Sequence, residues 1–304
     1  MPTLESVNPT TGEVVGRVPV TPTESIPGVV AEARRAFEEW GWTPLGQRVE
    51  TLAPIGARLM EHAETIGAQL SAEMGKPLKD AVGEVKACAH DWEQEVRDIA
   101  SALEPTVLED ENTRSTIYRD PYGVCAAITP WNFPMLMPHW QVLPALVAGN
   151  AVIMKPSEHT PLTAQAYAEA IAAFVPDGVI QIVHGDGALG AGLVEADGVD
   201  LITFTGSRAT GKRILARASE TLKRCLLELG GKDPMIVLEG ADLDEAAKFA
   251  ARNAFRNSGQ VCVSTERLYV ADSVYDDFMK AFVRETEAMK VGPSDAEDTV
   301  IGPM

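Results

Sequence analysis

Three residues that could carry out covalent chemistry lie in separate segments rich in turn-forming residues. Cys262 follows Ser-Gly-Gln-Val in SGQVCVST, Glu228 precedes Leu-Gly-Gly in LELGGK, and Asn132 lies between two prolines in TPWNFP. A thiolate can attack a carbonyl carbon, a carboxylate can serve as a general base, and an amide N–H can stabilise an oxyanion. Each residue alone also fits a plain structural role: a loop cysteine, an exposed strand-end acid, and a proline-locked turn in which Trp131 fills the core. Together, in this order, they favour nucleophilic catalysis.

A second set of residues could hold a nucleotide. Lys155, Ser157 and Glu158 lie in KPSE, directly after the apolar run AVIM. Gly206 and Ser207 end the segment FTGS, ahead of a helical stretch. Charged groups at a strand end can hold a ribose, and the free N–H groups at the start of a helix bind phosphate. The alternatives are a solvated Lys–Glu pair and an ordinary serine cap.

The segment HGDGALG matches the Gly-x-Gly-x-x-Gly pattern and includes Gly187 and Gly190. It follows an apolar run and precedes a helical stretch, as a pyrophosphate-binding loop does. However, the strand before it is not the first of the predicted sheet, and no ribose-binding acid is evident about 20 residues further on. The pattern alone is therefore a weak indication of a pyrophosphate site.

The elements that must position these residues alternate between apolar runs and helical stretches from residue 120 onward. The predicted strands are GVCAAIT, AVIMK, VIQIVH and LITFT, with helices near 135–148, 161–174, 188–196 and 208–219. Strands that are apolar along their whole length belong to a parallel sheet covered on both faces, and ligands collect at the carboxyl ends of such strands. The candidate segments follow these strands directly.

The rest of the chain has other patterns. Residues 24–99 repeat apolar positions at helical spacing, after two short extended segments, and residues 104–119 indicate a strand, a polar turn and a strand. Beyond CLLELGG, the predicted order is a strand at PMIVLE, a helix near 242–257, the cysteine loop, a strand at RLYVA and a helix near 274–290.

Composition argues against several classes of function. The net charge of −18 repels phosphate backbones and anionic lipid, so we expect no nucleic-acid or membrane partner. The four cysteines and five histidines have no metal-ligand spacing, so we expect no metal site. No apolar run approaches the length of a membrane span, and the N-terminus has no secretory pattern, so we expect a cytoplasmic protein.

These segments, in this order, resemble the signature segments of the aldehyde dehydrogenase superfamily, in its NAD(P)-dependent, hydrolytic branch. The segments are TPWNFP, KPSE, FTGS, LELGGK and SGQVC, and the opening NPTTGEVVGRVP is also typical. The resemblance implies an α/β fold with a Rossmann-like parallel sheet. Its implied parts are a cofactor domain at 1–103 and 120–230, an oligomerisation hairpin at 104–119, and the start of a second α/β catalytic domain at 231–304.

The resemblance also implies a role for each catalytic candidate. Cys262 matches the nucleophile, Asn132 matches the oxyanion hole together with the backbone N–H of Cys262, and Glu228 matches the base that activates the deacylating water. The implied reaction is the oxidation of an aldehyde to a carboxylic acid through a cysteine thiohemiacetal and a thioester. Five residues are expected to line the substrate tunnel: Phe133, Leu136, Trp140, Val261 and Val263.

The implied cofactor is NAD, with NADP as an alternative. Lys155 and Glu158 match residues that hold the adenosine ribose, and a carboxylate bonded to the 2′-hydroxyl would repel a 2′-phosphate. The other cofactor-binding candidates are Trp131, Ser157, Gly187, Gly190, Gly206, Ser207 and Leu229.

Chains of this superfamily continue well past IGPM, where this sequence ends. We expect the larger part of the catalytic domain to lie in the missing part, with a strand that pairs with the 104–119 hairpin of a neighbouring subunit in a homo-oligomer. We also expect a chain ending at Met304 to fold poorly alone and to have little activity. One alternative is a catalytically silent nucleotide-binding fragment. Another is a CoA-acylating relative, against which Glu228 argues.

Overall fold

The computed structural model describes residues 2–304, and its centre is a five-stranded parallel sheet. The strand order is β7-β6-β5-β8-β9, and every neighbouring pair is parallel. The strands are β5 (Val124–Ile128), β6 (Ala151–Lys155), β7 (Ile180–Ile182), β8 (Leu201–Gly206) and β9 (Arg224–Leu229). The predicted α/β class and parallel sheet are confirmed, and each of the four apolar runs contains a strand.

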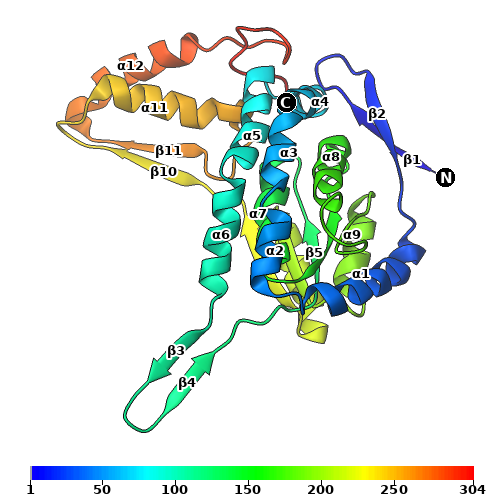
Figure 1. Ribbon diagram of the computed structural model, residues 1–304. Helices are drawn as coiled ribbons and strands as arrows, with labels where there is room; N and C mark the ends of the chain where they lie inside the picture. Colours follow the sequence, from blue (N-terminus) through cyan, green and yellow to red (C-terminus); the bar gives the residue numbers. More distant parts are fainter. Residues whose placement is uncertain (1) are drawn as a thin grey trace.

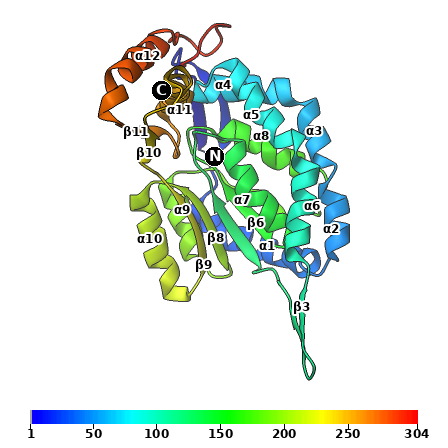
Figure 2. The ribbon, with the colours of Figure 1, turned by 90° about the vertical axis from the view of Figure 1, so that its left-hand side faces the viewer.

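Helices cover both faces of this sheet (Figures 1 and 2). One face packs against α7 (Leu136–Val147) and α8 (Pro161–Ala172), and the other against α1 (Ile26–Trp40), α9 (Gly187–Glu195) and α10 (Arg208–Ala218). Side chains alternate along β5, so that Cys125 and Ala127 belong to the first core while Val124 and Ala126 belong to the second. All four are buried, which explains why the strand has no polar face.

The N-terminal third is largely helical, as predicted. It begins with an antiparallel hairpin of β1 (Thr3–Val7) and β2 (Val14–Pro19). The helices after α1 are α2 (Leu45–Leu52), α3 (Ile55–Glu61), α4 (Ala63–Met74), α5 (Leu78–His90) and α6 (Trp92–Leu103). Gly75 ends α4 with a left-handed φ of 86°, and Pro77 directly precedes α5. The sequence EMGKP therefore makes a sharp turn between two packed helices.

A second hairpin projects from the body beyond α6, at the bottom of Figure 1. Its strands β3 (Thr106–Glu109) and β4 (Arg114–Ile117) pair antiparallel, and all of their residues are exposed. The predicted hairpin is confirmed, while its pairing with another subunit stays a prediction.

A smaller unit follows residue 231. The strands β10 (Asp233–Val237) and β11 (Thr265–Val270) form a parallel pair, on which α11 (Leu243–Phe255) and α12 (Tyr275–Glu287) pack. The C-terminal segment returns to the turn between α4 and α5, where the N–H of Leu78 donates to the carbonyl oxygen of Ser294 at 2.9 Å. Within residues 2–304, no helix has the length and apolar character needed to cross a bilayer.

Candidate active site

Two adjoining cavities of about 870 and 350 Å³ lie at the carboxyl edge of the sheet. Strand β5 has β6 on one side and β8 on the other, so the chain diverges here and leaves a crevice. The cavities share a wall formed by Pro130 and Trp131, which follow β5, and by Thr205, Gly206 and Ser207 at the end of β8. A ligand that lies along the larger cavity therefore reaches the smaller one.

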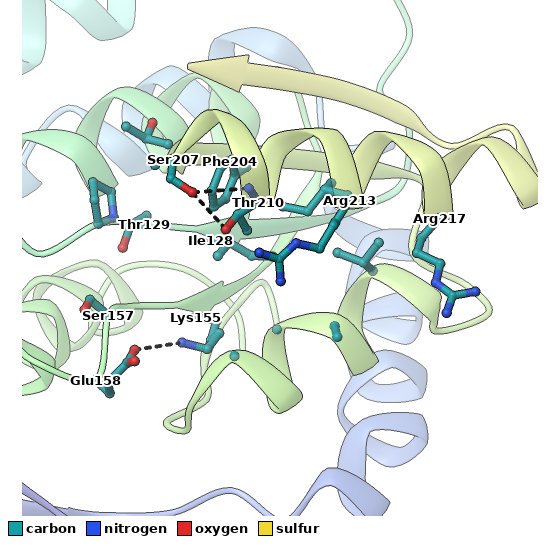
Figure 3. Close-up of a pocket in the computed structure, with 18 of the residues that line it drawn as sticks. Ile128, Thr129, Lys155, Ser157, Glu158, Phe204, Ser207, Thr210, Arg213 and Arg217 are labelled. Atoms are coloured by element: carbon teal, nitrogen blue, oxygen red, sulfur yellow. Dashed lines mark hydrogen bonds and ion pairs between the residues drawn. The ribbon is translucent and has the colours of Figure 1, made fainter. Parts of the chain in front are cut away.

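Lys155 and Glu158 lie on the β6 side of the larger cavity, as predicted (Figure 3). The Nζ of Lys155 lies 4.0 Å from the Glu158 carboxylate and donates to the carbonyl oxygen of Pro156 at 2.8 Å. Burial lowers the pKa of Lys155, and the nearby carboxylate opposes this effect. The neighbouring Ser157 also lines the cavity. A cation and a carboxylate placed side by side suit a pair of ribose hydroxyls, because one donates and the other accepts hydrogen bonds.

The wall formed by α9 contains Gly187 and Gly190. A Cβ atom at Gly190 would lie 3.4 Å from Cδ of Lys155, so a larger side chain would project into the slot between α9 and β6. The glycine thus keeps this end of the cavity open. The loop before α9 follows β7, which is an edge strand and not the first strand of the sheet along the chain. Its Gly-x-Gly-x-x-Gly pattern therefore does not have the position of a usual pyrophosphate loop.

The turn from β8 into α10 has the geometry of an anion site. At Gly206, a Cβ atom would lie 2.5 Å from the ring of Phe204, so a side chain there requires that ring to shift. The hydroxyl of Ser207 accepts a hydrogen bond from the N–H of Thr210 at 3.2 Å and caps α10. The remaining N–H groups of the first turn, at the positive end of the helix, are available to a phosphate.

Cys262 lines the smaller cavity and is exposed. The other three cysteines line neither cavity: Cys88 and Cys125 are buried and Cys225 is half-buried. Burial raises the pKa of the Cys88 thiol well above its usual range and that of Cys125 to about 12. Both buried thiols therefore stay protonated at neutral pH, and Cys262 is the thiol that a cavity ligand can meet.

The residues predicted to lie near Cys262 are mostly brought to it. Asn132 and Leu229 line the same cavity. The five expected tunnel residues also line it: Phe133, Leu136, Trp140, Val261 and Val263.

Asn132 joins the loop after β5 to the loop that carries Cys262. Its Nδ2 donates to the carbonyl oxygen of Gln260 at 2.8 Å, and Nδ2 of Asn257 donates to the carbonyl oxygen of Asn132 at 3.0 Å. A carboxamide has two N–H groups. The bond to Gln260 therefore fixes the Asn132 side chain and leaves its second N–H for a ligand.

The backbone before Cys262 is strained. Asn257, Ser258 and Gly259 have successive φ values of 52°, 58° and 76°. A left-handed conformation costs about 1–2 kcal/mol for a residue other than glycine. The hydroxyl of Ser258 donates to the carbonyl oxygen of Gly302 at 3.0 Å. This run turns the chain back after α11, and strain of this kind is typical of functional loops.

Glu228 is not brought into either cavity. It lies next to last on β9, an edge strand, and its side chain is exposed, as is that of Leu226 on the same face. Its backbone pairs with Thr205, which lines both cavities, and the next residue is Leu229. The predicted base is thus adjacent in the chain to Leu229, which lines the smaller cavity, and its role stays a prediction.

Two arginines of α10 line the larger cavity, and the sequence reasoning missed both (Figure 3). Arg217 pairs with Glu195 of α9 at 3.2 Å, whereas Arg213 forms no ion pair within residues 2–304. Together with Thr210, they recur at the i, i+3, i+7 spacing of one helical face. With Ser207 as the N-cap of α10, this spacing in the sequence could have indicated that both arginines share the helical face of Thr210.

A third missed arginine lines the smaller cavity. Arg256 lies six residues before Cys262, and its Cζ is 5.3 Å from the centroid of the Phe133 ring. It places a positive charge beside a cavity whose other lining residues are mostly apolar. Arg256 is the C-cap residue of α11 and lies just outside the signature segment SGQVC, so no local pattern marks it.

A family model described as "Aldehyde dehydrogenase family" matches residues 2–304. The mitochondrial succinate-semialdehyde dehydrogenase of Arabidopsis thaliana is 40% identical over 99% of this chain and 58% of its own length. A probable succinate-semialdehyde dehydrogenase [NADP(+)] of Sinorhizobium fredii is 38% identical over 98% of this chain and 61% of its own. The crystal structure of an NAD-dependent aldehyde dehydrogenase from Sinorhizobium meliloti has a TM-score of 0.95 at 35% identity, and covers 99% of this chain and 61% of that one. The chain thus spans about three fifths of the length of these relatives.

Proposed function

The chain belongs to the aldehyde dehydrogenase family, and we propose that it provides the nucleotide site and the nucleophile of an enzyme that oxidises an aldehyde to a carboxylic acid with NAD(P). The observation that carries this proposal is the wall shared by the two cavities. Because the cavities adjoin at this wall, one end of a ligand in the larger cavity would lie close to the exposed thiol of Cys262.

The residues of the larger cavity fit a dinucleotide. The volume of the larger cavity, about 870 Å³, lies within the usual range of small-molecule sites. Lys155 and Glu158 would hold the ribose hydroxyls, and the N-terminus of α10 at Ser207 would hold the pyrophosphate. Glu158 favours NAD over NADP, since its carboxylate repels a 2′-phosphate. A bound nicotinamide supplies the hydride acceptor.

In the proposed mechanism, the thiolate of Cys262 adds to the aldehyde carbon. The second amide N–H of Asn132 and the backbone N–H of Cys262 stabilise the oxyanion that forms. Hydride loss from the thiohemiacetal carbon leaves a thioester on the sulfur. Glu228 takes a proton from a water molecule, which attacks the thioester carbon, releases the acid and regenerates the thiolate.

We infer that the substrate is a short aldehyde with a carboxylate at its far end. Two relatives are named for succinate semialdehyde. In this chain, Arg256 adds a guanidinium to the otherwise mostly apolar lining of the smaller cavity. Guanidinium groups bind carboxylates through two parallel hydrogen bonds, so an ω-carboxylate would be oriented with its aldehyde carbon toward Cys262.

Two measurements on the purified chain test the proposed function. Calorimetry with NAD and NADP reports the nucleotide site, and absorbance of the reduced nucleotide reports turnover with succinate semialdehyde and with neutral aldehydes of similar length. Binding of NAD together with aldehyde-dependent NADH formation supports the proposal. Binding without turnover on any aldehyde supports the silent nucleotide-binding protein, which the position of Glu228 outside both cavities favours. Absence of nucleotide binding contradicts both.

A further inference from the structure

A buried ion pair lies behind the loop that carries Asn132. Lys76, in the turn between α4 and α5, pairs with Glu84 of α5, and the two side chains are 3% and 4% exposed. Burial lowers the pKa of Lys76, and the charge of Glu84 opposes this effect. A buried pair contributes little net stability, because the desolvation of two charges offsets their attraction. Its presence here therefore needs an explanation other than stability.

Both members of the pair bind the loop after β5. The Nζ of Lys76 donates to the carbonyl oxygen of Asn132 at 3.2 Å. An oxygen of Glu84 accepts from the N–H groups of Met135 and Leu136, at 3.1 and 3.0 Å. Leu136 is the first residue of α7, so Glu84 also satisfies N–H groups at the positive end of that helix. The pair thus binds this loop both at Asn132 and at the start of α7.

The cysteine loop binds the same segment. The carbonyl oxygen of Asn132 accepts from Nδ2 of Asn257 as well as from Lys76, while its carboxamide donates to Gln260. The prolines around this residue restrict the backbone, but they leave the direction of the side chain open. Lys76 and Asn257 fix the backbone oxygen, and this sets where the carboxamide lies relative to Cys262.

We propose that Lys76 and Glu84 are positioning residues, which hold Asn132 so that its free amide N–H faces the oxygen of a carbonyl group attacked by Cys262. This inference rests on the proposed function. An oxyanion donor is effective when its position is fixed before the reaction. A misplacement of about 1 Å can cost roughly a hundredfold in rate.

The test compares two reactions of the Cys262 thiol. With p-nitrophenyl acetate, the sulfur adds to the ester carbonyl carbon, the C=O π pair moves to oxygen, and collapse forms a thioester and expels p-nitrophenolate. With iodoacetamide, the sulfur displaces iodide from a saturated carbon, and no oxyanion forms. Both rates depend on the thiolate population, so their ratio reports oxyanion stabilisation. Mass spectrometry of the peptide that contains Cys262 gives both rates without any nucleotide.

Asn132→Ala is the reference variant and should lower the ratio of acylation to alkylation by about tenfold or more. Lys76→Met and Glu84→Gln should lower it in the same direction, with no further loss when either is combined with Asn132→Ala. Lys76→Arg, which keeps a cationic donor, should restore part of it. The matched control is Lys86→Met on α5, the helix that carries Glu84, because the Lys86 ammonium pairs with the exposed Glu64 at 2.7 Å.

Two results would overturn the inference, and they distinguish failure of the positioning role from failure of the proposed oxyanion role. If Lys76→Met and Glu84→Gln lower the melting temperature but keep the wild-type ratio, the pair is only structural. If Asn132→Ala itself keeps that ratio, the oxyanion role within the proposed function is wrong, and the positioning role with it. Should Lys76→Met fail to fold, the double variant Lys76→Met/Glu84→Leu removes both charges and allows the same comparison.

Discussion

The carboxamide nitrogen of Asn132 lies 2.8 Å from the carbonyl oxygen of Gln260, although 128 positions separate the two residues in the sequence. This hydrogen bond joins the first strand-end loop of the large sheet to the cysteine loop of the smaller unit. Both groups assigned to the oxyanion hole, the Asn132 amide and the Cys262 N–H, are therefore part of one connected structure.

Cys262→Ala should abolish aldehyde-dependent NADH formation, because the variant lacks the sulfur that bonds to the substrate carbon. Calorimetric NAD binding should persist, since the larger cavity is unchanged. Cys225→Ala removes a half-buried thiol outside both cavities and is the control. Turnover by Cys262→Ala at a rate near that of the control would contradict the assignment of the nucleophile.

Glu228→Gln should slow deacylation more than acylation, because the base is needed only for the attacking water. Stopped-flow absorbance is expected to show a burst of NADH followed by slow steady turnover. Equal losses in burst and steady rate would assign Glu228 another role, such as activation of the thiol.

Glu158→Ala should narrow the preference for NAD over NADP by roughly five- to tenfold, because two charges about 4 Å apart interact by about 1 kcal/mol in a water-like dielectric. The measured quantity is the ratio of kcat/KM for the two nucleotides. Glu169→Ala removes an exposed carboxylate of α8 that lines neither cavity and serves as the control. An unchanged ratio in Glu158→Ala would mean that the ribose is recognised elsewhere.

Arg256→Gln should raise KM for succinate semialdehyde by roughly ten- to a hundredfold, the loss of a charge-assisted hydrogen bond. The KM for a neutral aldehyde of similar length should change little. Arg252→Gln, one turn earlier on α11 and outside the lining of both cavities, is the matched control. Equal effects on both aldehydes would contradict recognition of a substrate carboxylate.

His184 should make the folded state sensitive to mild acid. Its side chain is buried, and burial, together with the charge of Lys155, lowers its pKa to about 4. The unfolded chain, with an ordinary histidine pKa near 6.5, binds more protons between these two values. The contribution of His184 to the free energy of unfolding is therefore fully present above about pH 6.5. It falls by up to about 3 kcal/mol as the pH drops toward 4.

The measurement for His184 is the free energy of unfolding by denaturant across that pH range. His184→Gln should flatten the curve in this window. His90→Gln, which replaces an exposed histidine, should leave it as in the wild type. Parallel curves for the wild type and His184→Gln would contradict the assignment.

The parallel sheet could be predicted because β5 and β6 are buried on both faces, and the sequence therefore shows uninterrupted apolar runs. The strand-end candidates followed from the same pattern, since carboxyl ends of parallel strands share one edge. The edge strand β9 differs, because its residues alternate between exposed and half-buried. Its position in the sheet, and hence the outward direction of Glu228, depends on topology that no local pattern encodes.

Lys76 and Glu84, which sequence reasoning also missed, are charged groups brought to Asn132 from a distant segment of the chain. Lys76 follows a glycine and precedes a proline, so its sequence context indicates only a turn. Its partner Glu84 lies eight residues further on, across the start of α5, which is not a spacing that marks a helical pair. Their link to Asn132 exists only after α5 packs beside α7.

The left-handed run before Cys262 limits how this chain could be made more heat-resistant. Glycine at position 258 would relieve the strain of a φ of 58°, because glycine adopts a left-handed conformation without steric cost. It would also remove the hydroxyl that bonds the carbonyl oxygen of Gly302 at 3.0 Å. The same substitution would therefore remove a hydrogen bond between the cysteine loop and the C-terminal segment, so the backbone at position 258 favours glycine while the bond to Gly302 requires a hydroxyl.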